Sequence, residues 1–293
     1  MVSAVEQSVL FQYWQIFLPL FLLFAAFLYL KDKKEIEAFT NASKKVREHN
    51  KLDGADLVAV TEEDIDQEDE FSPSLETKDH VPFSGASVTL PGGAKEFYKM
   101  ANDRRSVRKY STKPVPIEVI EDCVRSAGTG PSGAHTEPWT FCVISSAEIK
   151  QEIRDIIEQE ELLNYTQRMH KQWTTDLSPL KTNHVKEYLT DAPYLILIFK
   201  QTYGLREDRK RKQHYYNEIS TSIATGILLS AIQSAGLSSL ITTPLNCGPA
   251  LRSLLNRPAN EKLLVLLPVG YPSDDCKVPD LSRKDLSEIM VKY

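Results

Sequence analysis

The chain has 293 residues, of which 42% are hydrophobic and 26% are charged, values that exclude a chain disordered throughout. The net charge of −5 is uneven: residues 53–79 hold eleven acidic residues and one basic residue, a charge of −10, which leaves +5 on the rest of the chain. So small a positive excess over so much chain argues against nucleic-acid binding.

The first predicted element is a membrane anchor. Residues 9–30 form an apolar run that as a helix would span roughly 33 Å, enough to cross a bilayer. The run is longer than that of a cleaved signal peptide and lacks its basic start. Lys31, Lys33 and Lys34 follow it, so the positive-inside rule places the rest of the chain in the cytosol. We therefore expect residues 1–30 to anchor the chain in the plasma membrane or a cytoplasmic vesicle membrane.

The chain after this anchor divides into a tether and a folded domain. Residues 31–93 are polar, acidic and without sustained periodicity, which is typical of a flexible linker. Residues 94–293 have a comfortable length for one domain. Two N-x-[ST] sequences, at Asn41 and Asn164, could be glycosylated only outside the cytosol. We therefore expect both to be unmodified.

Apolar periodicity in the folded domain predicts an α+β fold. Short, fully apolar strands that alternate with helices indicate a sheet covered on both faces. The insertion from about 158 to 190 is highly charged. The predicted helices cover residues 94–101, 116–127, 147–173 and 217–235, and the predicted strands cover residues 140–145, 194–199, 240–243 and 263–269.

The four cysteines and six histidines predict neither a disulfide framework nor a metal site. No pair of cysteines has C-x-x-C spacing, and no pair of histidines has H-x-x-x-H spacing. We expect free thiols in a reducing compartment.

Residues 128–133 match the G-x-G-x-x-G dinucleotide motif, but in the wrong context. That motif follows a strand and opens a helix, whereas here a helix precedes it and a strand follows. Ser132 and His135 also lack the G-x-S-x-G turn that would present a nucleophile. We therefore expect neither a Rossmann-type site nor a serine nucleophile here.

An arginine cluster is a stronger signal. Arg104, Arg105 and Arg108 lie within five residues, and planar guanidinium groups bind phosphate oxygens through several hydrogen bonds. Alone, such a cluster could equally be a solvated basic turn. The second signal is the turn at residues 131–139, rich in glycine and proline, which would present backbone N–H groups.

The R-R-S-x-R cluster, the P-S-x-x-x-x-x-P-W turn and the late Arg283 together resemble the flavin-dependent nitroreductase superfamily. His135 and Glu137 depart from the Asn and Gln that are usual there. The resemblance implies FMN as cofactor, a central mixed sheet flanked by helices, and a domain-swapped homodimer with flavins at the subunit interface. The cofactor-binding residues that it implies are Arg104, Arg105, Ser106, Val107, Arg108, Pro131, Ser132, Ile241, Thr242, Thr243 and Arg283.

The insertion, the two departures and the anchor together resemble the iodotyrosine deiodinase family. In that family the insertion is a lid over the substrate, and the matching positions are Glu161, Tyr165 and Lys186. The residue types agree, since a zwitterionic amino acid needs an anion for its ammonium and a cation for its carboxylate. Tyr165 lies one helical turn after Glu161 and can donate a hydrogen bond. Without the resemblance, these would read as ordinary surface residues.

The resemblance implies reductive removal of iodide from mono- and diiodotyrosine, with electrons ultimately from NADPH, directly or through a partner reductase. The backbone N–H of Ala134 would hold the substrate phenolate. Thr243 matches the position whose hydroxyl hydrogen-bonds flavin N5; its alternative is a strand-end threonine that bonds to backbone. Two other functions stay open: a broad NAD(P)H-dependent nitro or quinone reductase, and a non-catalytic, membrane-anchored interaction protein.

Overall fold

The computed structural model describes residues 75–293, apart from 84, 86–88, 90–91, 170 and 207–209. The predicted anchor at residues 1–30 and most of the predicted tether at residues 31–93 lie outside them. Within the described part of the chain, no helix is both long enough and apolar enough to span a bilayer.

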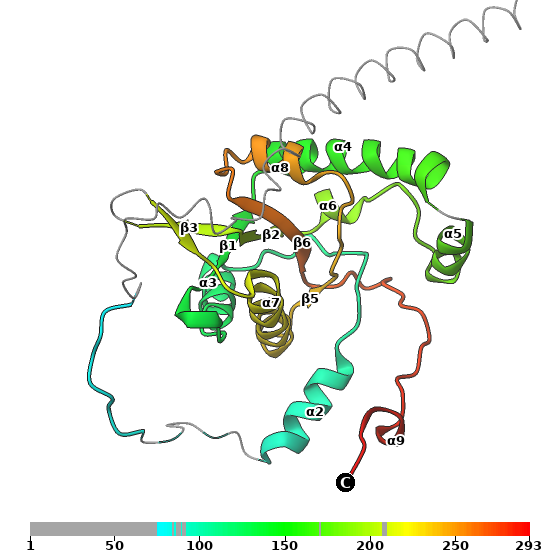
Figure 1. Cartoon of the computed structure of the whole chain (residues 1–293). Coiled ribbons are helices and arrows are strands. Elements are labelled where there is room, and N and C mark those ends of the chain that lie inside the picture. Colours follow the sequence, from blue (N-terminus) through cyan, green and yellow to red (C-terminus); the bar gives the residue numbers. More distant parts are fainter. Residues whose placement is uncertain (1–74, 84, 86–88, 90–91, 170, 207–209) are drawn as a thin grey trace, which may run out of the picture. The chain divides into compact units, whose positions relative to one another are not determined.

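A four-stranded sheet forms the centre of the domain (Figure 1). Its strands, in spatial order, are β1 (Trp139–Ile144), β2 (Tyr194–Gln201), β6 (Glu261–Gly270) and β5 (Ser238–Ser239), and every neighbouring pair is antiparallel. The prediction of a mixed sheet is therefore wrong for the strands themselves. Strand β2 runs antiparallel to β1 because the connection through the insertion brings the chain back to the end of β1, where Leu195 pairs with Ile144. The one parallel pairing among the described residues is the isolated bridge between Ser106 and Ser239.

Both faces of the sheet are covered by helices, as predicted. Strand β2 is apolar on both of its faces. Leu195, Leu197 and Phe199 contribute to one core, and Ile196 and Ile198 contribute to the other; none of the five is exposed to solvent. The first core is covered by α4 (Ala147–Leu163), α6 (Tyr188–Asp191) and α8 (Gly248–Leu254); the second is covered by α3 (Ile117–Ala127) and α7 (Asn217–Ser234).

The ends of two helices follow their sequence signals. The Ser146 hydroxyl accepts a hydrogen bond from the backbone N–H of Ile149 at 3.2 Å, which caps α4. Helix α7 ends just before Gly236, whose φ of 71° is the left-handed conformation that glycine adopts most easily. The predicted helix over residues 217–235 is confirmed, with its C-terminal end one residue earlier.

The predicted helix over residues 147–173 is wrong as a single element. Helix α4 ends at Leu163 and is followed by a π-helical turn, η4 (Asn164–Arg168), then by α5 (Lys171–Leu177) and the 3-10 turn η5 (Ser178–Leu180). Asn164 begins the π-helical turn: it is 1% exposed, and its amide oxygen accepts a hydrogen bond from Asn246, 82 positions later in the chain, at 3.3 Å. The backbone N–H of Met169 donates to the carbonyl of Asn164, five positions back, at 2.8 Å, which makes the turn π-helical; the helical backbone ends at Met169, whose ψ is 135°.

Several smaller elements differ from the prediction or were not predicted. The strand expected at 240–243 is reduced to one bridge, between Thr242 and Leu266, because Pro244 follows it and cannot donate to a ladder. Sequence patterns also missed the hairpin β3 (Tyr203–Leu205) and β4 (Arg211–Gln213), and the short helices α6, α8 and α9 (Leu286–Ile289).

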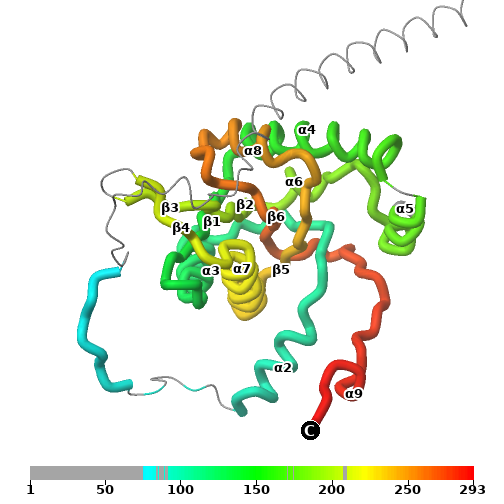
Figure 2. The backbone as a smooth tube through the Cα atoms, in the orientation of Figure 1, coloured from blue at the N-terminus to red at the C-terminus, as the bar shows by residue number. Residues whose placement is uncertain are grey.

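The C-terminal segment returns past the end of α2 (Gly93–Asp103), as the tube in Figure 2 shows. Arg283 makes this contact: its guanidinium donates to the backbone carbonyl of Asn102 at 2.9 Å and to that of Arg104 at 2.9 Å. Segments about 180 positions apart are thereby joined beside the arginine cluster.

The buried strand β2 predicts a large stability loss on truncation. We expect Leu197→Ala to lower the free energy of unfolding by about 2–5 kcal/mol, because Leu197 is fully buried and its removal leaves a cavity. Urea unfolding measures the change. Leu205→Ala on β3 is the control: Leu205 is 63% exposed, so its truncation should change that free energy by less than about 0.5 kcal/mol. Equal losses in the two variants would contradict the assigned core.

Candidate active site

The predicted phosphate-binding arginines meet in one pocket. Its volume is about 330 Å³, within the range of small-molecule sites. Leu180, from the insertion, also lines it, so the pocket lies where the arginine cluster, the C-terminal segment and the insertion meet. The lining residues are Arg104, Arg105, Ser106, Arg108, Leu180, Val278, Pro279, Leu281, Ser282 and Arg283.

Two of the four arginines are held by the protein itself. Arg105 donates to the backbone carbonyl of Pro279, and Arg283 donates to Asn102 and Arg104. Val107 does not line the pocket; it is buried, and its backbone N–H donates to the carbonyl of Ser239 at 3.2 Å. The Val107 bond and the bridge between Ser106 and Ser239 fix the cluster to the edge of the sheet at β5.

The other two arginines are not tied to other side chains in the part of the chain that the structure describes. Neither Arg104 nor Arg108 has a side-chain hydrogen bond or ion pair with any described residue, and no carboxylate lines the pocket. Four guanidinium groups without a counter-charge repel one another, and an anion with several oxygens would neutralise them through multiple hydrogen bonds. The donor set therefore fits the phosphate of a nucleotide cofactor.

The structure also brings together the three predicted lid residues. Glu161 on α4 and Lys186 form an ion pair with 3.2 Å between Oε2 and Nζ, and they are 8% and 5% exposed. The Lys186 ammonium lies 5.6 Å from the ring centre of Tyr165. Burial raises the pKa of Tyr165, against the effect of its hydrogen bond with Thr182. Two opposite charges thus lie buried side by side, which is costly unless each keeps a partner.

Tyr188 connects the pocket, the lid residues and the Thr242 segment, and sequence reasoning missed it. It is 7% exposed, and its side chain is hydrogen-bonded to Thr242. Burial raises its pKa to about 12; the charge of Arg108 opposes this shift, and that of Glu161 adds to it. No local signal marks a tyrosine in a four-residue helix as part of a site.

Thr243 differs from its neighbour. Thr242 pairs with Leu266 through both backbone groups, at 3.0 and 2.9 Å. Thr243 is exposed, and its hydroxyl makes no hydrogen bond to any residue in the described ranges. The alternative of a strand-end threonine bonded to backbone is therefore not what the structure has. Ile241 is 40% exposed.

The turn at residues 131–139 is strained and leaves backbone N–H groups without an acceptor among the described residues, that of Ala134 among them. Ala134, His135 and Glu137 have φ of 49°, 51° and 45°, a conformation that costs energy for residues with a Cβ atom. The N–H groups of His135 and Glu137 donate to Ser132 at 3.1 and 3.0 Å. The N–H of Ala134 has no acceptor among the residues that the structure describes, and Ala134 is exposed.

The structure does not bring this turn to the arginine pocket. Pro131, Ser132 and Ala134 are absent from the lining of the pocket. The turn instead lies against the start of α7, where a Cβ on Gly133 would be 3.0 Å from the carbonyl oxygen of Tyr215. Within one chain, the two predicted parts of the cofactor site are therefore separate.

Comparison with known proteins agrees with this geometry. The model of the nitroreductase family matches residues 101–271. The iodotyrosine deiodinase of Drosophila melanogaster is 67% identical over 227 residues, which cover 77% of this chain and 79% of the relative. Iodotyrosine deiodinase 1 of Homo sapiens is 53% identical over 263 residues, which cover 89% of this chain and 90% of the relative. A crystal structure of oxidized iodotyrosine deiodinase bound to FMN and 3-iodo-L-tyrosine superposes with a TM-score of 0.59 at 28% identity, covering 67% of this chain and 98% of that one.

The burial of Tyr188 predicts a phenol that titrates late. Its folded pKa of about 12 exceeds the value of about 10 in an unfolded chain, so its stabilising contribution is complete below pH about 10 and is lost as the pH rises towards 12. We expect the difference between alkaline titrations of the wild type and Tyr188→Phe, followed by phenolate absorbance, to show one phenol ionising near pH 12. If the phenol that the variant lacks ionises near pH 10 in the wild type, Tyr188 is not buried as described.

Proposed function

This chain belongs to the nitroreductase family and, within it, to the iodotyrosine deiodinases, and we propose that it removes iodide reductively from mono- and diiodotyrosine with FMN as its cofactor. The observation that carries the proposal is the buried Glu161–Lys186 pair, which lies in an insertion that also lines the arginine pocket. A broad nitro or quinone reductase would gain nothing from such a pair, and a non-catalytic anchor would gain nothing from the pocket.

The residues of this chain fit FMN. Arg104 and Arg108 are free to bind its phosphate, while Arg105 and Arg283 hold the pocket in shape. We assign Ser106 and Ser132 to the ribityl chain and the ring, and the free hydroxyl of Thr243 to flavin N5. When bound, the flavin supplies the electrons for the reaction; the protein supplies placement and electrostatics.

Substrate recognition follows from the charges of the lid. The ammonium of an amino acid would pair with Glu161 and its carboxylate with Lys186, with Tyr165 adding a hydrogen bond. Each buried charge then exchanges one partner for another, and none is left unpaired. Closure of the insertion over the ligand would exclude water and strengthen both pairs.

The aromatic ring of the substrate would be held by the strained turn. The free N–H of Ala134 is a donor suited to the phenolate oxygen of an iodinated tyrosine. In the overall reaction the carbon–iodine bond breaks and a carbon–hydrogen bond forms. The ring takes up two electrons and a proton, and iodide leaves.

A second copy of the chain would complete the site. In one chain the turn lies apart from the pocket, beside the start of α7. That region exposes Tyr216 (71%), Ile219 (60%) and Ile223 (42%), an apolar surface that suits contact with another subunit. We propose a homodimer in which the turn of one subunit approaches the arginine pocket of the other.

The cellular setting is also a proposal. We place the catalytic domain on the cytosolic side of the plasma membrane or of a vesicle membrane, through the predicted anchor at residues 1–30, with electrons from NADPH directly or through a reductase. Asn164 supports the cytosolic side: its amide is buried and hydrogen-bonded to Asn246, which an attached glycan would prevent. Asn41 lies outside the described residues.

The function predicts iodide release that depends on both lid charges. After anaerobic reduction of the purified, FMN-bound protein, addition of diiodotyrosine should release iodide. We expect Glu161→Gln and Lys186→Gln to keep FMN, judged by flavin absorbance, but to release iodide at least about 100-fold more slowly at low substrate, because each change leaves a buried charge unpaired.

Lys181→Gln is the matched control for this experiment. It removes the same charge from an exposed position in the same insertion, so its iodide release should equal that of the wild type. Rapid turnover of nitroaromatics by all four proteins, without iodide release from diiodotyrosine, would favour the broad reductase instead.

A further inference from the structure

Lys186 lies in a segment without regular structure, yet its side chain must meet the substrate at a defined place. It precedes α6 and belongs to neither a helix nor a strand. A lysine side chain has four rotatable bonds and loses much conformational freedom when it is fixed. Its ammonium donates to the carbonyl of Asn183 in the same segment, so the place of the side chain is defined only if the backbone of that segment is held to the rest of the fold.

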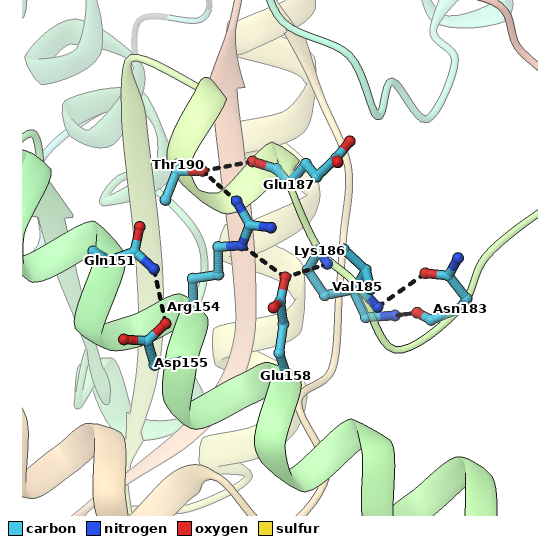
Figure 3. Close-up of polar contacts among 9 residues, drawn as sticks. All are labelled: Gln151, Arg154, Asp155, Glu158, Asn183, Val185, Lys186, Glu187 and Thr190. Carbon is cyan, nitrogen blue, oxygen red and sulfur yellow. Dashed lines mark hydrogen bonds and ion pairs between the residues drawn. The ribbon is translucent and has the colours of Figure 1, made fainter.

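Glu158 on α4 holds that backbone, as Figure 3 shows. Its Oε1 accepts the backbone N–H of Lys186 at 2.6 Å, and the same oxygen accepts Nε of Arg154, one turn earlier on α4, at 2.7 Å. Both side chains are about one-fifth exposed, so water competes only weakly for these bonds.

Arg154 extends the connection to the other side of Lys186. Its Nη1 donates to Oγ1 of Thr190 at 2.9 Å, and that hydroxyl donates to the carbonyl of Glu187 at 3.0 Å. The segment that carries Lys186 is thus fastened to α4 both at Lys186 itself and within the next turn (Figure 3).

Helix α4 therefore determines the position of Lys186 relative to Glu161. Glu158 and Glu161 are three residues apart on α4, which places them on neighbouring positions of one face. Glu158 holds the backbone of Lys186, and Glu161 faces its ammonium at 3.2 Å. The distance between the partner of the substrate ammonium and the partner of its carboxylate is set by this arrangement.

We infer that Glu158, oriented by Arg154, is a positioning residue for recognition of the substrate carboxylate. The inference rests on the proposed function of Lys186 in the lid. Because Glu158 acts on binding and not on the reacting ring, its loss should raise KM for iodotyrosine and leave kcat nearly unchanged.

The test is calorimetric titration of the FMN-bound full chain with 3-iodotyrosine. We expect Glu158→Ala to weaken binding about tenfold, since it removes charge-assisted hydrogen bonds that hold Lys186. Glu158→Gln keeps an oxygen that can accept the Lys186 N–H, so it should restore affinity to within about threefold of the wild type.

Asp155→Ala is the matched control. Asp155 is an exposed acid on the same helix, and its carboxylate accepts a hydrogen bond from Gln151 at 2.7 Å, but it does not contact the Lys186 segment (Figure 3). It should bind 3-iodotyrosine as the wild type does. A loss as large as that of Glu158→Ala would show a general effect of charge removal and would overturn the inference.

A double variant separates this inference from the proposed function. If Glu158 acts through Lys186, Glu158→Ala should cause no further loss once Lys186→Gln is present. If the two changes lower the affinity for 3-iodotyrosine additively, the positioning role alone is overturned. The same holds if Glu158→Ala keeps wild-type affinity while Lys186→Gln loses it. An unaffected Lys186→Gln would overturn the lid assignment itself. If Glu158→Ala yields no folded protein, Arg154→Gln takes its place, and wild-type affinity in that variant overturns the inference.

Discussion

Glu161 and Lys186 are almost fully removed from water, and their charged groups lie 3.2 Å apart. The Asn164 amide also donates to Glu161, and the Lys186 ammonium also donates to the carbonyl of Asn183. A buried charge that loses its partner costs several kcal/mol. The pair can therefore be opened without that cost only by a ligand that brings one positive and one negative group. In the proposed function the lid would be selective because the Glu161–Lys186 pair has the charge pattern of the substrate's amino-acid end.

The arginine pocket also needs a partner of opposite charge, but its own charges are all positive. Its four guanidinium groups have no carboxylate among them, so an anion of several oxygens is the partner that they lack. Tyr188 interacts electrostatically with Arg108 of the pocket and with Glu161, and it remains neutral at physiological pH because burial raises its pKa to about 12. It thus joins the two sites without adding a charge that would compete for either ligand.

Sequence patterns predicted the parts of the fold that depend on local apolarity. Strand β2 is apolar throughout and was found within two residues. The change to a π-helical turn at Asn164 was not predictable from local apolarity, because Asn164 is buried in a contact with Asn246, far along the chain. The same holds for Tyr188 and Glu158, whose contacts exist only in the folded molecule. Glu161, Tyr165 and Lys186 look like surface residues by type; only the family resemblance marked them, and the structure then brought them together.

The most direct test of the charge constraint compares three ligands on the FMN-bound wild type by calorimetric titration. 3-Iodotyrosine carries both charges, 3-iodotyramine lacks the carboxylate, and 3-(4-hydroxy-3-iodophenyl)propionate lacks the ammonium. Each analogue leaves one buried side chain unpaired, at a cost of about 3–5 kcal/mol, so both should bind at least about 100-fold more weakly than 3-iodotyrosine. Binding of either analogue within about threefold of 3-iodotyrosine would contradict the account.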